Sequence, residues 1–123
     1  MELEALTSRI LSAAFRVHSA MGPGLLESVY QAALTHELRK AGFRIATQVE
    51  IPVVFDGIKL DVAFRADIIV EALVILELKS VEILAPVHSK QLLNYLNLSG
   101  LKVGLLLNFN TVSLKDQIVR LVN

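Results

Sequence analysis

The sequence predicts an α/β fold in which a central mixed sheet of about four strands is flanked by helices. The first observation behind this prediction is the order of the predicted elements: two helices, three antiparallel strands, a helix, a strand and a final helix. The second is that the segments 73–76 and 103–107 are apolar on both faces. Such segments are typical of strands buried inside a sheet.

The composition fits a single domain over residues 1–123, large enough for a core and too small for two. Although 54% of the residues are hydrophobic, no apolar run approaches the roughly 18 residues that a membrane helix needs. Glu2 and Glu4 lead straight into an amphipathic pattern, so we expect no signal peptide. The absence of cysteine excludes disulfides and thiolate metal sites. We therefore expect a cytoplasmic protein that makes no membrane contact.

The charge balance argues against strong nucleic-acid binding by the whole surface. Twelve basic residues match twelve acidic ones, whereas proteins that hold nucleic acid mainly through its phosphates are usually basic overall. Any nucleic acid must therefore contact a local basic surface.

Two amphipathic helices are predicted at the start of the chain. Apolar residues recur every three or four positions from Leu3 to Met21, and Gly22-Pro23-Gly24 ends this helix. A second helix begins near Leu25 and stops at Ala41-Gly42.

Alternating segments follow. A half-exposed strand begins near Phe43, and Pro52 suggests that it lies at a sheet edge or contains a bulge. Asp56-Gly57 is a strong hairpin signal, because type I′ turns need positive φ at both central residues. The return strand runs from Ile58 to Val70.

The length of the next loop decides where Asp67 points. A two-residue loop at Glu71-Ala72 would place Asp67 opposite Leu76, on the other face of the sheet from Glu77. A three-residue loop would place Asp67 opposite Glu77 on the same face. Glu71-Ala72 lacks the Gly, Asn or Asp of a primed turn, so we favour the longer loop.

The pattern of the C-terminal third predicts a crossover connection, in which a helix joins two parallel strands. Pro86 suits the first turn of a helix over residues 87–98, which Ser99-Gly100 closes. The segment 103–109 is then a buried strand, and the intervening helix implies parallel pairing with the strand that carries Glu77. We expect residues 114–122 to form a short terminal helix.

Three charges lie in these apolar strands. Asp67 opens one apolar run, and Glu77 and Lys79 interrupt the next on one face. Buried charges are costly unless they are paired or bind a metal. Two carboxylates are suitable ligands for Mg²⁺ or Mn²⁺, and Lys79 could position water or stabilise charge on a phosphate. The alternative is an internal salt bridge of Lys79 with Asp67 or Glu77, which would leave the second carboxylate without a partner.

Two helices supply further candidates. Glu27 lies in the first turn of the second helix, where the helix dipole alone would favour it, or it points inward as a third metal ligand. Gln91 and Tyr95 share a face of the third helix. Gln91 could reach the site, whereas we expect Tyr95 to pack in the core.

These residues carry a family resemblance. Asp67 followed by Glu77-x-Lys79, between a helix carrying Glu27 and one carrying Gln91, resembles the PD-(D/E)xK nuclease superfamily. Gly24-Leu25-Leu26-Glu27-Ser28-Val29-Tyr30 matches the signature of the GxxExxY proteins, and the resemblance spans residues 10–123. It implies a restriction-endonuclease-like core, which agrees with the predicted element order.

The resemblance also implies an activity, namely Mg²⁺-dependent cleavage of DNA or, less often, RNA. It makes Glu27, Asp67 and Glu77 metal ligands and Lys79 the catalytic lysine, and Gln91 matches a helix glutamine of the exonuclease-like branch. One departure is Ala66, which stands before Asp67 where the motif often has proline.

Three questions stay open at this point. The alternative function is a regulatory or nucleic-acid-binding module of the same fold with little or no turnover, and a weaker one is hydrolysis of a small phosphoester. A symmetric homodimer would suit cleavage of two strands. The sequence names no interface for such a dimer.

Overall fold

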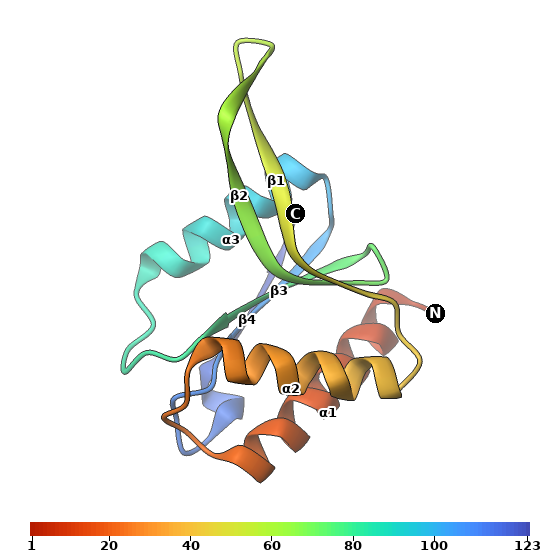
Figure 1. The fold of residues 1–123 in the computed structure, drawn as a ribbon, viewed down its shortest axis with the longest axis vertical. Helices are drawn as coiled ribbons and strands as arrows, with labels where there is room; N and C mark the ends of the chain where they lie inside the picture. The colour runs from red at the N-terminus through yellow and green to blue at the C-terminus, as the bar shows by residue number, and fades with distance from the viewer.

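The computed structural model describes residues 1–123 and contains three α-helices, one short 3₁₀ helix and five strands (Figure 1). In chain order these elements are α1 (Leu3–Met21), α2 (Glu27–Lys40), β1 (Ile45–Phe55), β2 (Ile58–Val70), β3 (Val74–Lys79), α3 (Pro86–Ser99), β4 (Val103–Asn108), η1 (Leu114–Gln117) and β5 (Ile118–Val122). The α/β class and the two N-terminal helices are as predicted. None of the helices is long and apolar enough to cross a membrane.

The five strands form one mixed sheet in the order β1-β2-β3-β4-β5. All neighbours are antiparallel except β3 and β4, which are parallel and joined by α3. This is the predicted crossover. β3 and β4 are buried along nearly their whole length, because helices cover both faces of the sheet at its centre.

The two faces have separate apolar cores. On one face, α1 and α2 pack against the sheet through side chains such as Ile10, Leu34 and Leu76. On the other face, α3 packs through Leu92 and Leu96. Figure 1 shows α1 and α2 together below the sheet and α3 beside it.

The prediction of a C-terminal helix is wrong. Residues 114–117 form only a 3₁₀ turn, and Ile118–Val122 is a strand antiparallel to β4. The spacing of Leu114, Ile118 and Leu121 is compatible with a helix, but residues 118–122 are mostly β-branched or apolar and suit a strand. Pairing with β5 also satisfies the outer backbone groups of β4. The sheet therefore has five strands instead of about four.

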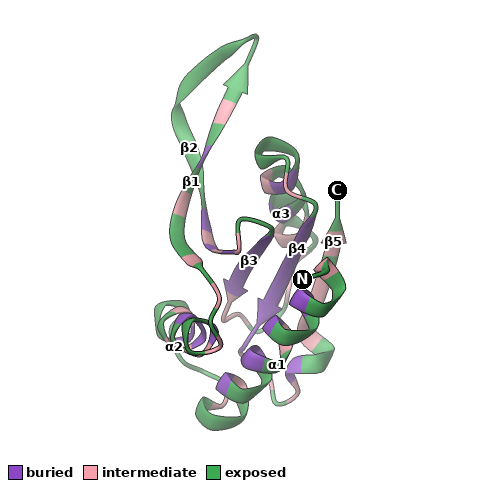
Figure 2. Cartoon of the chain, turned by 90° about the vertical axis from the view of Figure 1, so that its right-hand side faces the viewer, coloured by how far each residue is buried: buried purple, intermediate pink, exposed green.

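The distal half of the β1–β2 hairpin, residues 52–65, projects from the body, and we call it the arm. Figure 2 shows it extending beyond the helices, and apart from half-buried Val53 all of its residues are exposed. Asp56 and Gly57 have φ values of 55° and 73°, as the predicted turn requires. Pro52 lies on an edge strand, next to a register shift. Strand β1 is more exposed than the predicted half-exposed strand, because Ile51 is its only buried residue. Helix α3 does not extend over the arm.

Candidate active site

The sheet divides where β2 leaves β3. These two strands pair from Val70↔Val74 to Ile68↔Leu76, after which β2 follows β1 into the arm and β3 continues beside β4 (Figure 1). The next residue on each strand is Asp67 and Glu77 respectively. We call this point the fork. It holds the two carboxylates that the sequence analysis singled out.

The predicted three-residue loop is confirmed. The expectation that Glu71-Ala72 would not adopt the backbone of a primed turn is not confirmed. Residues 71–73 connect Val70 to its partner Val74, so Asp67 faces Glu77. Glu71 and Ala72 nevertheless both have positive φ, 53° and 55°, as in a primed turn. The carboxylate of Glu71 accepts a hydrogen bond from the backbone N–H of Arg44 at 2.5 Å, which helps to hold this conformation.

The two carboxylates replace the missing backbone ladder at the fork. Glu77 Oε1 accepts a hydrogen bond from the backbone N–H of Asp67 at 3.0 Å. Asp67 Oδ2 accepts one from the backbone N–H of Leu78 at 2.8 Å. Each carboxylate thus accepts a hydrogen bond from a backbone N–H of the neighbouring strand. These bonds hold both side chains on one side of the sheet.

Burial and mutual repulsion raise the pKa of both acids. Glu77 is only 8% exposed, and burial, followed by the negative charge of Asp67, raises its pKa to about 8. Burial also raises the pKa of Asp67, against the opposing effect of the hydrogen bond from Leu78. Ionising both groups together is therefore unfavourable unless a cation joins them.

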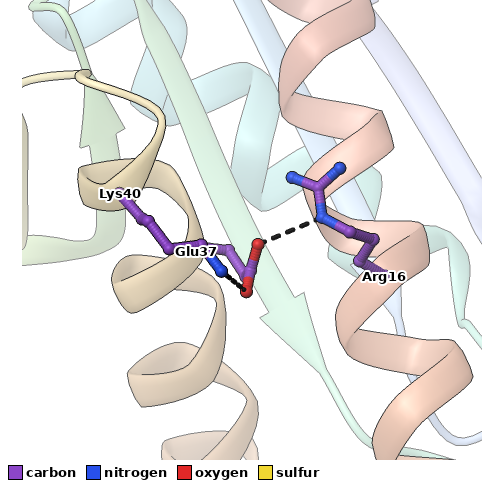
Figure 3. Close-up of polar contacts among 3 residues, drawn as sticks. All are labelled: Arg16, Glu37 and Lys40. Atoms are coloured by element: carbon purple, nitrogen blue, oxygen red, sulfur yellow. Dashed lines mark hydrogen bonds and ion pairs between the residues drawn. The ribbon is translucent and has the colours of Figure 1, made fainter.

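No internal ion pair supplies that cation. The chain's ion pairs use the carboxylates of Glu4, Glu37 and Glu71. Figure 3 shows Glu37 between Arg16 of α1 and Lys40 of α2. Lys79 is half-buried and its charge lowers the pKa of both fork acids, but it forms a salt bridge with neither. The alternative of a structural salt bridge is therefore not realised.

The segment before α2 brings Glu27 toward the fork. The Tyr30 hydroxyl donates to the carbonyl of Gly22 at 2.5 Å and accepts from the Leu25 N–H at 3.1 Å. The Ser80 hydroxyl, next to Lys79 at the end of β3, donates to the Leu25 carbonyl at 2.6 Å. Glu27 is the first residue of α2 and is exposed.

The three predicted ligands do not form a closed cluster. The negative charge of Glu27 raises the pKa of both Asp67 and Glu77, so it lies within electrostatic range of them. No three acidic or histidine side chains, however, are close enough together to hold a metal ion. Glu27 and Ser80 both line a shallow depression of about 360 Å³.

Of the two predicted residues of α3, Tyr95 is the one that lies within electrostatic range of the fork acids. Its ring packs against Phe64 with centroids 5.1 Å apart, and it borders the α3 core as expected. Burial, followed by the charges of Glu77 and Asp67, raises its pKa. Gln91 lies one turn earlier on the same side of α3, is exposed and makes no hydrogen bond.

Gln48 is a neighbour of the site that the sequence analysis missed. It lies opposite Asp67, because Thr47 pairs with Ile68 and Val49 with Ala66. Its amide donates to Gln31 Oε1 at 2.7 Å and to Asp67 Oδ1 at 3.4 Å. Its φ of 51° is unusual for a non-glycine residue inside a strand. A polar residue with a strained backbone beside a half-buried carboxylate is a signal that only the three-dimensional structure reveals.

Comparison with known proteins agrees with this geometry. The family model described as PD-(D/E)XK nuclease superfamily matches residues 4–121, nearly the whole chain. No curated protein and no solved structure matches the chain. The match includes the helix that carries Glu27, both strands of the fork and the helix that carries Gln91. The chain belongs to the PD-(D/E)XK nuclease superfamily.

Proposed function

We propose that this protein is a Mg²⁺- or Mn²⁺-dependent nuclease that hydrolyses phosphodiester bonds in DNA, with RNA as the second substrate class. The observation that carries the proposal is the pair of carboxylates at the fork. Glu77 is buried and Asp67 is half-buried, and the two face each other without an ion-pair partner. Superfamily membership supports nucleic acid as the substrate.

The donor set fits a hard divalent cation. Two carboxylates are enough for Mg²⁺, which keeps several waters and takes further oxygens from substrate phosphates. Asp67 and Glu77 would hold the ion, and the exposed side chain of Glu27 is free to turn toward it. When bound, the cation would neutralise phosphate charge and favour ionisation of a water.

The remaining residues take roles set by their positions. Lys79 follows Glu77 by two residues on β3 and therefore points to the same side. Its ammonium group would orient the attacking water or stabilise the negative charge that develops on the phosphate. Gln91, with free amide donors on α3, would contact a phosphate of the substrate.

A cleavage screen tests the proposal. Labelled single-stranded, duplex and branched DNA, together with RNA, would be incubated with the protein in Mg²⁺, Mn²⁺ or EDTA. We expect cation-dependent cleavage of at least one DNA substrate, lost in Glu77→Gln and Lys79→Ala. A matched control is Glu82→Gln, an exposed acid on the segment after β3. Absence of cleavage of every substrate would contradict the proposal.

Thermal unfolding separates this proposal from a module that keeps the fold without a working site. A ligand that binds only the native state must raise the melting temperature. We expect Mn²⁺ to stabilise the wild-type protein and not Glu77→Gln. A module without a metal site would show no stabilisation in either protein.

A further inference from the structure

The arm exposes large apolar side chains that nothing in the chain covers. Phe55 is 71% exposed and Ile58 is 62% exposed. With them, the exposed apolar residues of the arm are Val54, Leu60, Val62 and Phe64. Soluble proteins seldom gather exposed apolar side chains in this way, and where they do, the patch commonly marks an interaction surface.

One face of the arm continues the core under α3. Ile51 pairs with Phe64, so their side chains share a face. Ile51 is buried against Leu92 and Leu96 of α3, and the Phe64 ring packs on Tyr95. The pair Phe55↔Ile58 lies at the far end of the same hairpin, with Phe55 on the same parity as Ile51. The apolar surface thus begins inside the protein and continues outside it.

The edge of the arm is protected, whereas its apolar face is not. β1 is an edge strand, and such strands can pair with another chain. Here Pro52 lacks an N–H, and the register shift between Pro52 and Val54 interrupts the ladder. Both features discourage edge-to-edge pairing. Contact through side chains of the apolar face is therefore favoured over extension of the sheet.

The charges of the arm favour a partner with the same mixture of charges. The arm carries two acids, Asp56 and Asp61, and two bases, Lys59 and Arg65, and none of the four is in an ion pair. The net charge of the arm is therefore zero, so it offers a polyanion such as nucleic acid no net electrostatic attraction. In a two-fold contact each patch meets its own copy. Two arms of zero net charge then meet without net repulsion.

We propose that this arm is a dimerisation surface, with its apolar face covered by the arm of a second copy of the same chain. The five exposed side chains of this face, Phe55, Ile58, Leu60, Val62 and Phe64, present about 500 Å² of surface per copy, so a symmetric contact would bury about 1,000 Å², near the lower limit for a specific interface. Because the arm begins at the fork, such a dimer would also fix the spacing between two candidate sites. The inference does not depend on nuclease activity.

Sedimentation velocity over a range of protein concentrations tests this proposal. We expect the wild-type protein to sediment as a dimer and Phe55→Glu as a monomer. Because Phe55 is mostly exposed in the single chain, the variant should keep the wild-type far-UV circular dichroism. The matched control is Val112→Glu, which places the same charge at a 94% exposed valine outside the arm. It should remain dimeric.

A second measurement keeps the proposal falsifiable if Phe55→Glu does not fold. The chain has no cysteine, so single Ile58→Cys and Val112→Cys variants can be oxidised without interference. We expect a disulfide-linked dimer from Ile58→Cys and not from Val112→Cys. A wild-type protein that stays monomeric at every concentration would overturn the proposal. So would a monomer whose binding to labelled DNA falls in Phe55→Glu, since the arm would then contact nucleic acid.

Discussion

Glu77 accepts a hydrogen bond from the backbone N–H of Asp67, while Asp67 accepts one from Leu78, so the two acids close the fork between β2 and β3. The groups proposed to hold a metal therefore also satisfy backbone donors. This explains how buried Glu77 and half-buried Asp67 can lie together without an ion-pair partner: when Glu77 is protonated, its other oxygen can still accept the bond from Asp67. The arrangement becomes unfavourable when both acids ionise, because their negative charges then repel each other.

The pH dependence of stability follows from that cost. The pKa of Glu77 is raised from 4.5 to about 8, so the folded protein retains a proton that the unfolded chain releases. The free energy of unfolding should then fall as pH rises from about 4.5 to 8, by up to about 1.4 kcal/mol per pH unit. Asp67 contributes with the same sign.

Urea denaturation in EDTA between pH 5 and 8.5 measures this slope. Glu77→Gln should flatten it and be more stable than the wild-type protein at pH 8. The acids with lowered pKa, Glu37 and Glu71, lose their stabilising effect only at lower pH and do not mask the slope. A wild-type stability that is constant or rises over this range would contradict the assignment.

Cation binding should release a proton from the fork. Mn²⁺ needs both carboxylates ionised, so we expect its affinity to increase between pH 6 and pH 8. At a concentration about 100-fold above the dissociation constant, it should stabilise the protein by about 2.7 kcal/mol. Calorimetric titration at the two pH values, in buffers of different ionisation enthalpy, measures both affinity and proton release. Equal affinities would show that Glu77 is not a ligand.

Gln48 offers a way to separate strain from function. Its φ of 51° suits glycine better than alanine, so Gln48→Gly should be more stable than Gln48→Ala by about 1 kcal/mol. Both variants lose the amide that contacts Asp67, and their rates of DNA cleavage should fall together. Equal stabilities would argue against backbone strain. Wild-type rates in both variants would argue against a positioning role.

The Tyr30 hydroxyl should matter more for Glu27 than for the core. Tyr30→Phe keeps the ring that stacks on Phe109 at 4.5 Å but removes the bonds to Gly22 and Leu25. We expect a loss of about 1 kcal/mol in the free energy of unfolding and weaker Mn²⁺ binding. Thr7→Val, which removes a part-buried hydroxyl bonded to the Leu3 carbonyl within α1, is the control for loss of a hydroxyl group. If the two variants bind Mn²⁺ equally well, the Gly22–Leu25 segment does not position Glu27.

Local chemistry was enough to predict most elements. Gly22 and Gly100 end helices with positive φ, and Asp56-Gly57 forms its turn. The face shared by Asp67 and Glu77 followed from loop length alone. In contrast, residues 118–122 depend on a tertiary partner, because only the free edge of β4 makes them a strand. The spacing of apolar residues in this segment does not show that β4 has a free edge.

The position of Gln48 shows a second limit. The tight turn at Phe55↔Ile58, continued without interruption, would place Gln48 opposite Arg65. The register shift near Pro52 moves the partner by two residues, to Asp67. Pro52 suggested that a bulge exists, but neither its size nor the strand that holds the extra residues is specified by one proline. The neighbours of Asp67 on β1 therefore cannot be predicted from the sequence alone.

The most direct test of the central claim is the single-turnover rate of DNA cleavage by wild-type protein and Glu77→Gln, each in Mg²⁺ and in EDTA. The fork predicts cleavage only by wild-type protein in Mg²⁺, with Glu77→Gln slower by at least about 100-fold although it remains folded. Cleavage that persists in EDTA, or a Glu77→Gln rate equal to wild type, would show that the Asp67–Glu77 pair is not the active site.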